Sequence, residues 1–478
     1  MWRTLGLFGG VTIGWWALLW LALPQSWQRI SPSAILMLHL APPMLLSAGV
    51  KLWSYLKEKR AAEEATQQEA QAEAERSDKR EAARAQHAAE LRERQRAVGC
   101  RWLWTAAAPV KDEPAWLVKM ADGAHWQVLE RGEVGAGEAM DALSPHLAEM
   151  LSGLYAEAPG AAWLPLYLEP MRQVPGVEQL TRVKELKLQA VADSLGADVH
   201  VGGDCRFLPG SGQLADRVLQ VLQQDPELPG LLVLAADAPL AERGGDDDWG
   251  EADLESAKLR RWRGEPGIAV VAMLFLRDDL AAPAEPEQEA EDADPYQPYW
   301  EKDFAGLSAG WGVVPPSQQA SLARLPKLAV LSQSSSVSLA QEKALQLARS
   351  LQPVLDNALV NAALLDYPFS PEEAKPENNQ ASTLAWLCHN SGQIDVGGVR
   401  LAAIATALSR HRVELHPIDE ASNVVCEWGD AGAATAMLLV AAAVSHCARL
   451  QAPAVITHFH DELVSLAMAR PPAEEAIA

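Results

Sequence analysis

Two apolar stretches near the N-terminus stand apart from the rest of the chain. Residues 5–23 carry no charge and include Trp15, Trp16 and Trp20, and their length is about what a helix needs to cross a bilayer. A second apolar stretch, residues 34–50, contains the pair Pro42–Pro43, which predicts a kinked or broken helix. We expect residues 1–56 to form an antiparallel helical hairpin that anchors the chain in a membrane through residues 5–50.

The charges beside these stretches predict an orientation. Arg29 lies in the connecting loop, whereas four basic residues come at or after the end of the second stretch: Lys51, Lys57, Lys59 and Arg60. Basic residues favour the cytoplasmic side, so we expect the chain after residue 57 in the cytoplasm. A second stretch that re-enters without crossing would weaken this assignment. A signal peptide is less favoured, because the first stretch is long, rich in Trp and lacks a small-residue cleavage site.

Residues 57–98 show no apolar periodicity. They are rich in Ala, Glu, Gln and Arg and contain no Gly or Pro, a composition that favours a helix. Glu75 and Lys79, like Glu90 and Arg94, have the favourable order for ion pairs four residues apart. Since no apolar heptad runs through the segment, we expect a solvated helical spacer rather than a coiled coil.

From residue 99 onward, short apolar strands alternate with amphipathic helices. Two such series, residues 99–280 and 325–478, predict a layered α/β body in two halves. The predicted helices are 145–155, 212–224, 338–351, 398–410 and 431–448, and the predicted strands are 163–168, 231–237, 267–276, 325–331, 384–388, 413–415, 422–427 and 453–458.

An acidic linker or insertion, residues 281–324, separates the halves. Its aromatic residues Tyr296, Tyr299 and Trp300 either dock a partner or tuck the loop onto the body.

Composition limits the classes of function. The 478 residues carry a formal charge of −23, which disfavours nucleic-acid binding because that affinity rests on Lys and Arg beside phosphates. The five cysteines are scattered without a C-x-x-C pair, which fits a reducing compartment better than a disulfide framework. No P-loop or strand-bound Gly-rich nucleotide motif occurs, and we expect no cofactor.

Two C-terminal segments resemble a known family. Residues 388–392 read Cys-His-Asn-Ser-Gly, and residues 424–434 open an alanine-rich helix. This layout is similar to the last third of a β-ketoacyl synthase, where a His-containing loop and a Lys-Ser-Asn-x-Gly-His segment each precede a helix. His389 matches the first catalytic His. Asp430 stands at the second His position and Val425 at the Lys position. The resemblance implies a duplicated thiolase-like fold with helix–sheet–helix–sheet–helix layers.

The chemistry of a condensing enzyme requires a Cys thiolate at a helix N-terminus and imidazoles that stabilise an oxyanion. The matching slot, residues 207–212, holds no Cys. Cys205 lies several residues too early, and Ser211 lacks an activating His pair. Asp430 would place a carboxylate where an oxyanion forms. We therefore expect a degenerate site without catalysis, with His389 and Asp430 as remnants and Cys205 as a nucleophile only if the loop is shifted.

His458 and His460 lie two residues apart on one strand face, but a single such pair is thin support for a metal, and we predict none.

The anchor, the charged helix and the ketosynthase-like body together resemble the type VI secretion lipase-adaptor family of Gram-negative bacteria. That resemblance implies an adaptor at the cytoplasmic face of the bacterial inner membrane, which binds an effector lipase and delivers it to the secretion spike protein. The alternative is a membrane-anchored acyltransferase or condensing enzyme of the ketosynthase type.

Overall fold

The computed structural model describes residues 2–22, 31–118, 120–121, 123–133, 138–199, 201–202, 204–242, 261–283, 310–339, 343–375, 379–460 and 463–472. The chain divides into two compact units, Met1–Ala88 and Ala89–Ala478.

The first unit begins with two helices, α1 (Trp2–Ala22) and α2 (Pro32–Arg94). The Trp15 indole N–H donates to the Leu38 carbonyl at 2.9 Å, and the Trp16 ring lies edge-on against His39. The two helices therefore contact each other as the predicted hairpin requires, while Arg29 of the connecting loop lies outside the described residues. Of the two outcomes predicted at Pro42–Pro43, a kink or a break, the break does not occur: α2 continues through both prolines.

Among the described residues, two helices are long and apolar enough to cross a membrane. One is α2, whose best 18-residue window has a mean hydropathy of 1.6 and is 6% buried. The other is residues 432–450, whose window is 72% buried and belongs to the protein core. In α1 the apolar helical part is the shorter Phe8–Leu21. Of the two N-terminal helices, α2 thus fits a membrane association by length and composition, whereas the described apolar part of α1 is shorter.

The C-terminal end of α2 is attached to the body through side chains. Arg94, which the sequence pairs with Glu90, donates to Asn357 Oδ1 at 2.7 Å and to Asn361 Oδ1 at 3.2 Å. Its guanidinium also lies 4.8 Å from the centre of the Tyr367 ring. Further back along α2, Glu75 and Lys79 form the predicted ion pair at 3.9 Å, with both side chains exposed.

The body of the second unit is built on one mixed sheet. Its first half contains β1 (Ala97–Ala107), β3 (Leu166–Leu168), β4 (Cys205–Phe207), β5 (Gly230–Asp237) and β6 (Ala269–Leu276), and its second half contains β7 (Ala329–Ser332), β9 (Trp386–His389), β10 (Ala421–Asn423), β11 (Ala454–His460) and β12 (Leu463–Arg470). Two further strands, β2 (Ala124–Val128) and β8 (Ser335–Ser338), pair with β1 and β12.

The two halves have the same topology. The strand order along the sheet is β10-β9-β11-β12-β7-β1-β6-β5-β3-β4. Followed outward from its first strand, β1 or β7, each half places its strands in the order first, fifth, fourth, second and third, counted along the chain. In each half the second strand is parallel to the third and fourth, and the fifth strand is antiparallel to the fourth and first. The predicted duplication is confirmed by this order. The halves join where β1 pairs with β7.

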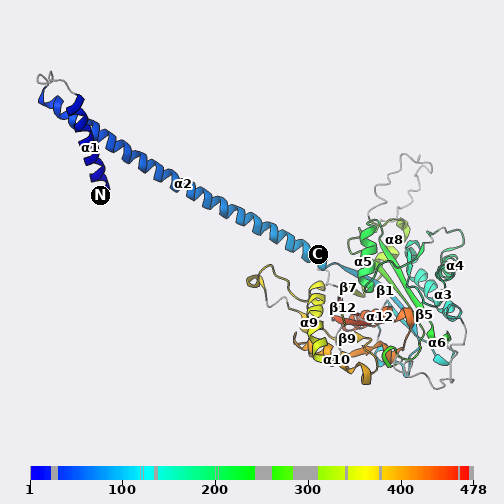
Figure 1. Cartoon of the computed structure of the whole chain (residues 1–478). Coiled ribbons are helices and arrows are strands. Elements are labelled where there is room, and N and C mark those ends of the chain that lie inside the picture. Colours follow the sequence, from blue (N-terminus) through cyan, green and yellow to red (C-terminus); the bar gives the residue numbers. More distant parts are fainter. Residues whose placement is uncertain are drawn as a thin grey trace, which may run out of the picture. The chain divides into compact units, whose positions relative to one another are not determined.

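Helices fill three layers around the two halves of the sheet (Figure 1). Helices α3 (Ala139–Glu157) and α4 (Gly176–Leu195) cover the outer face of the first half, and α9 (Ala344–Asn361) and α10 (Ile394–Ser409) cover that of the second. Between the halves lie α5 (Leu214–Gln224) and α12 (Thr435–Leu450), which share one core with strands from both halves. This is the predicted helix–sheet–helix–sheet–helix arrangement.

The alternation of side chains between the two faces of each buried strand explains the layers. Leu232 and Leu234 of β5 pack in the outer core of the first half, whereas Leu231, Val233 and Ala235 pack in the central core. Since successive strand residues point to opposite faces, a strand apolar at every position is buried on both faces. The continuous apolar strands of the sequence therefore mark the middle of a layered body.

Several predicted boundaries are wrong. Residues 413–415 form no strand, and the predicted strand 422–427 is the short β10 followed by helix α11 (Val424–Glu427). The predicted helix 338–351 begins later, as α9, and passes through Pro353, because the buried apolar face of α9 extends beyond the proline. Likewise α3 starts at Ala139, ahead of Pro145.

Within the predicted linker, residues 316–323 form α8 and pack on the body. Residues 284–309, with Tyr296, Tyr299 and Trp300, lie outside the described residues.

Each central helix begins against the opposite half. At the end of β5, the Asp237 carboxylate accepts a hydrogen bond at 2.8 Å from the Ala433 backbone N–H, in the turn that leads into α12. At the start of α5, the Gln213 side chain donates to His458 of β11. The fourth strand of one half thus contacts the entrance to the central helix of the other half, in both directions.

We predict that Asp237→Ala lowers the free energy of unfolding by about 1 to 3 kcal/mol. The change leaves the backbone N–H groups of Ala433 and Ala238 without their carboxylate acceptor at a buried position. Denaturant titration of the full chain in detergent would measure the loss. The matched control is Asp419→Ala, whose carboxylate is 79% exposed and should change stability by less than about 0.5 kcal/mol. Equal effects of the two substitutions would contradict the role given to Asp237.

Candidate functional site

The predicted nucleophile slot lies in the loop that enters α5. The helix begins at Leu214 with Gln213 at its N-cap, so the position nearest the helix N-terminus is held by Gln213 and not by a residue of 207–212. Gly210 and Gly212 have φ values of +85° and +109°, which glycine adopts without strain. The Arg217 guanidinium donates to the Leu208 and Pro209 carbonyls and fixes this loop. Ser211 is exposed and contacts neither His389 nor His458 through a hydrogen bond among the described residues.

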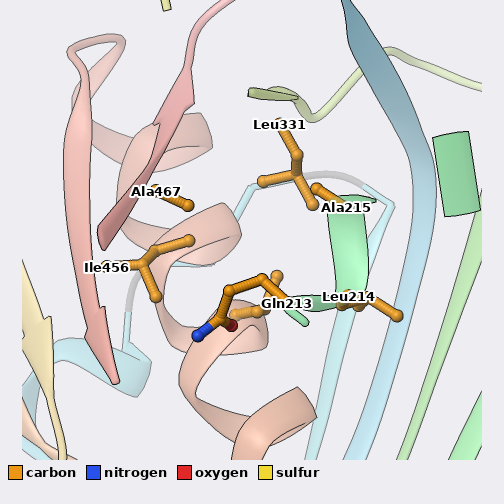
Figure 2. Close-up of a pocket in the computed structure, with 7 residues that line it drawn as sticks. Gln213, Leu214, Ala215, Leu331, Ile456 and Ala467 are labelled. Atoms are coloured by element: carbon orange, nitrogen blue, oxygen red, sulfur yellow. The ribbon is translucent and has the colours of Figure 1, made fainter. Parts of the chain in front are cut away.

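Gln213 joins the two halves of the body. Its side-chain N–H groups donate to His458 Nδ1 at 3.1 Å and to the Ser465 hydroxyl, on neighbouring strands β11 and β12. Figure 2 shows the side chain extending beside a small apolar space that Leu331, Ile456 and Ala467 help to line. That space measures about 10 Å³, about the volume that one water requires. Burial lowers the pKa of His458 to about 4, and the neighbouring His460 lowers it further.

His389 lies on a different face of the sheet. It ends β9 and is 2% exposed, with its Nδ1 2.9 Å from the Ser391 hydroxyl. Burial lowers its pKa to about 4, so the ring is neutral at pH 7. Leu387, two residues earlier, packs in the outer core with α9 and α10, whereas Cys388 packs in the central core. By alternation His389 faces outward, away from α5.

Asp430 serves the turn before α12. Its carboxylate accepts the Gly432 backbone N–H at 3.0 Å, and its own backbone pairs with Glu265 and Gly267. In the described part of the chain, no hydrogen bond or ion pair joins any two of Cys205, Ser211, His389 and Asp430. The two ketosynthase-like segments contact each other, since the Asn423 side chain donates to the Gly392 carbonyl at 2.8 Å, but no hydrogen bond joins their His389 and Asp430 in the described part of the chain.

Cys205 has a different environment from the one that the sequence predicts. It lies on β4 at the edge of the sheet, half-buried against the outer core of the first half, and not at the N-terminus of α5. Burial raises the pKa of its thiol, and the nearby ammonium groups of Lys187 and Lys184 lower it. The charge of Asp204 acts in the raising direction.

Lys187 lies fully buried behind Cys205. Its ammonium donates to the Leu164 carbonyl at 3.1 Å and to the Gly202 carbonyl at 3.2 Å, and it has no carboxylate partner among the described residues. Burial lowers its pKa, and the charges of Cys205 and Asp204 partly oppose that shift. A buried lysine whose pKa is lowered holds its amine in the neutral, proton-accepting form at a lower pH than an exposed lysine does.

Tyr155 completes this cluster from α3. The side chain is 1% exposed, and its hydroxyl has no hydrogen-bond partner in the described part of the structure. Burial raises the pKa of Tyr155, and the charge of Cys205 raises it further. Cys205, Lys187 and Tyr155 therefore bring a thiol, a buried amine and an O–H donor without a partner in the described residues to the same outer face of the first half.

The other thiols lack this combination. Burial raises the pKa of Cys100 and of Cys447 to about 12 and raises that of Cys388 well above its usual value. Cys426 is exposed, and desolvation raises its pKa too, followed by the charge of Glu427.

His458 and His460 lie on one strand face as predicted, with ring centres 5.9 Å apart. Among the described residues, no group of three or more potential ligands could hold a metal.

Sequence reasoning missed the residues around Cys205. Lys187 carries a usable signal, because it falls on the same helical face as Val183, Ala190 and Val191, which are all buried. A lysine on the apolar face of an amphipathic helix is unusual and requires an explanation. Tyr155 carries no such signal, since an aromatic residue on the apolar face of a helix is ordinary core. Gln213 was missed because the expected nucleophile slot ends at residue 212, whereas α5 begins at Leu214 with Gln213 as its N-cap.

No family model matches the sequence, and no curated protein matches it. Solved structures do resemble it. The ketosynthase from module 6 of the bacillaene synthase of Bacillus subtilis 168 is 10% identical over 70% of this chain and 59% of its own, with a TM-score of 0.38. The human mitochondrial 3-ketoacyl-CoA thiolase is 10% identical over 79% of this chain and 100% of its own, with a TM-score of 0.38.

The 3-oxoacyl-(acyl carrier protein) synthase III of Aquifex aeolicus VF5 is 9% identical over 78% of this chain and 99% of its own, with a TM-score of 0.37. The duplicated α/β fold itself rests on the strand order. Since all three identities are 10% or lower and the TM-scores are 0.38 or lower, no residue's role is carried over from these enzymes. This chain spans 59% of the bacillaene ketosynthase chain.

One expectation is corrected by these comparisons. The sequence analysis expected a protein without catalysis, whereas the solved structures that resemble the chain are enzymes by name: ketosynthases, a thiolase and synthase III proteins. Nothing in the comparisons supports a degenerate site or membership of the type VI secretion lipase-adaptor family.

The buried imidazole of His389 predicts a pH dependence of stability. Its pKa is about 4 in the folded chain against 6.5 for a free side chain, so the unfolded state binds more protons between these values. Stability is therefore present above pH 6.5 and is lost as the pH falls toward 4, by about 3 kcal/mol. His389→Gln should remove that part of the pH dependence in denaturant titrations at pH 7.5 and pH 4. The control His416→Gln, at a side chain 57% exposed, should preserve it; an unchanged slope for His389→Gln would refute the assignment.

Proposed function

We propose that the chain is a membrane-anchored acyltransferase that carries an acyl group as a thioester on Cys205. The observation that supports this proposal is that Lys187 is bound to the Gly202 carbonyl, three residues before Cys205, and that Tyr155 belongs to the core against which Cys205 packs. The proposal is the enzyme alternative of the sequence analysis, with the nucleophile on the edge strand β4 instead of at the start of α5.

The reaction is a thioester exchange. The neutral amine of Lys187 accepts the proton of the Cys205 thiol, and the thiolate attacks the carbonyl carbon of an acyl thioester. The Tyr155 hydroxyl, which has no other partner in the described residues, donates to the oxyanion that forms. The carbon–sulfur bond to the leaving thiol then breaks, and that thiolate takes the proton from the Lys187 ammonium. The products are acyl-Cys205 and a free thiol, and a second acceptor later removes the acyl group.

The position of Cys205 allows a substrate to reach it. Its side chain is only partly buried, and it lies on β4 at the edge of the sheet. Lys187, by contrast, lies below the surface, where water does not compete for its amine. The thiol is thus the part of the cluster nearest to solvent, and the base is the part furthest from it.

Covalent labelling tests this proposal. The full chain in detergent, incubated with an alkyne-tagged acyl-CoA, should acquire one label that hydroxylamine releases. Cys205→Ala should abolish labelling, and Lys187→Met, which keeps the length of the side chain, should slow it about 100-fold, since general base catalysis contributes about 10²- to 10⁴-fold. The matched control is Cys426→Ala, which removes the other accessible thiol and should leave labelling unchanged. Labelling that survives Cys205→Ala would overturn the assignment.

A second candidate is the delivery of an effector lipase to the type VI secretion spike at the cytoplasmic face of a bacterial inner membrane. The charged part of α2 favours it. Residues 57–94 would extend about 57 Å as a helix at 1.5 Å per residue. The end of this helix is fixed to α9 through Arg94, Asn357 and Asn361. A charged helical segment between an anchor and a body suits a protein that carries a bound client at a membrane.

Binding of a purified lipase tests this second candidate. A type VI phospholipase effector should be retained by the full chain in detergent at a defined stoichiometry, and by the Cys205→Ala variant equally well, since the acyl site is not part of that interaction. Size-exclusion chromatography with light scattering would measure the complex. A lipase that elutes separately from both forms would contradict delivery, whereas loss of binding only in Cys205→Ala would tie the interaction to the acyl site.

A further inference from the structure

Arg400 of α10 has an environment that none of the features above explains. Its guanidinium carbon lies 4.2 Å from the centre of the Trp262 ring and 4.6 Å from the centre of the Phe459 ring. The side chain is thus stacked on two aromatic rings, from a short helical segment, residues 261–263, and from the end of β11. Stacking of this kind restrains the plane of the guanidinium group.

The two aromatic rings are themselves held in place. The backbone N–H and C=O of Phe459 both bond to the Asn390 side chain, at 2.7 and 2.9 Å. Trp262 packs against Gly392, where an added Cβ would lie 3.1 Å from the indole. The neighbouring Arg261 carbonyl accepts the Gln393 backbone N–H at 2.9 Å. Arg400 therefore lies against a site whose shape is fixed before any ligand arrives.

The charge of Arg400 is not neutralised by a neighbour in the described part of the chain. No hydrogen bond or ion pair there reaches its guanidinium, and the nearby carboxylate of Asp395 is engaged with Arg261. Burial alone shifts the pKa of Arg400 downward from its usual value of 12.5, with no carboxylate contributing, and the group stays protonated at neutral pH. A half-buried cation without a counter-charge is costly, so a ligand that supplies the counter-charge would bind favourably.

The remaining donors define the ligand. The two rings lie close to the guanidinium carbon, and no acceptor for its N–H groups occurs among the described residues. Such N–H groups match two oxygens of a carboxylate or a phosphate in a planar fork. We propose that Arg400, between Trp262 and Phe459, forms a binding site for an oxyanion, either a carboxylate or a phosphate group. This site lies on the outer face of the second half and is independent of Cys205 in the first half.

Calorimetric titration of the full chain in detergent tests the proposal, with succinate and pyrophosphate as separate probes against a chloride baseline at constant ionic strength. At least one probe should bind saturably, and the tighter of the two identifies the class of oxyanion. Arg400→Lys keeps the charge but loses the fork and the stacking, and should weaken binding at least tenfold. Trp262→Leu, which removes one ring, should weaken it at least threefold.

The matched control is Arg410→Lys, at an exposed arginine that caps the other end of α10; it should leave the affinity unchanged. The thermal midpoint of each variant shows whether the fold is preserved. Binding that is unchanged in Arg400→Lys, or that fails to saturate for both probes, would overturn the site. Equal weakening in Arg400→Lys and Arg410→Lys would mean a general charge effect and would overturn it too.

Discussion

The packing of α5 and α12 between the two halves of the sheet is the constraint on which the rest of the body depends. Both helices bury apolar faces in one central core that strands of both halves share. The entrance to each helix is bound by the opposite half, α12 through Asp237 and α5 through His458. A helix N-terminus has unsatisfied backbone N–H groups, so buried entrances require polar partners from outside the helix. Because those partners come from the other half, neither half presents a complete central layer by itself.

This packing also sets the electrostatics of the interior. Burial lowers the pKa of His389, His446 and His458, so these rings are neutral at pH 7 and act as hydrogen-bonding groups. The same physical cause raises the pKa of Glu427 to about 7, against the indole groups of Trp116 and Trp428. In an interior this thoroughly buried, the pKa of a titratable side chain shifts so that its neutral form is favoured, unless a nearby charge opposes the shift.

The Cys205 cluster and the Arg400 site each place a basic side chain on an outer face of the body. Lys187 on α4 and Arg400 on α10 occupy helices that correspond in the duplicated topology, each between the second and third strands of its half. Lys187 is satisfied by backbone carbonyls, whereas Arg400 is stacked on aromatic rings. The corresponding helices of the two halves therefore hold a basic side chain in two different ways. One side chain is beside a thiol and suits proton transfer, and the other presents a donor edge and suits anion binding.

The sequence by itself determined the α/β class, the N-terminal apolar helices and the charged helix, because alternation, helical periodicity and helix-forming composition are local properties. The duplication came from the family resemblance, and the strand order bears it out. The sequence also directed attention to Cys205 and to the loop before α5. It placed several boundaries wrongly, as at Pro353 and residues 422–427, since burial of a neighbouring face outweighed the local signal.

Only the tertiary structure decided that His389 faces the outer core, that Gln213 caps α5, and that Lys187 and Tyr155 lie on the same outer face of the first half as Cys205. A site joins side chains from elements far apart in the chain, and which face of a sheet each one occupies depends on strand order, which local periodicity does not contain.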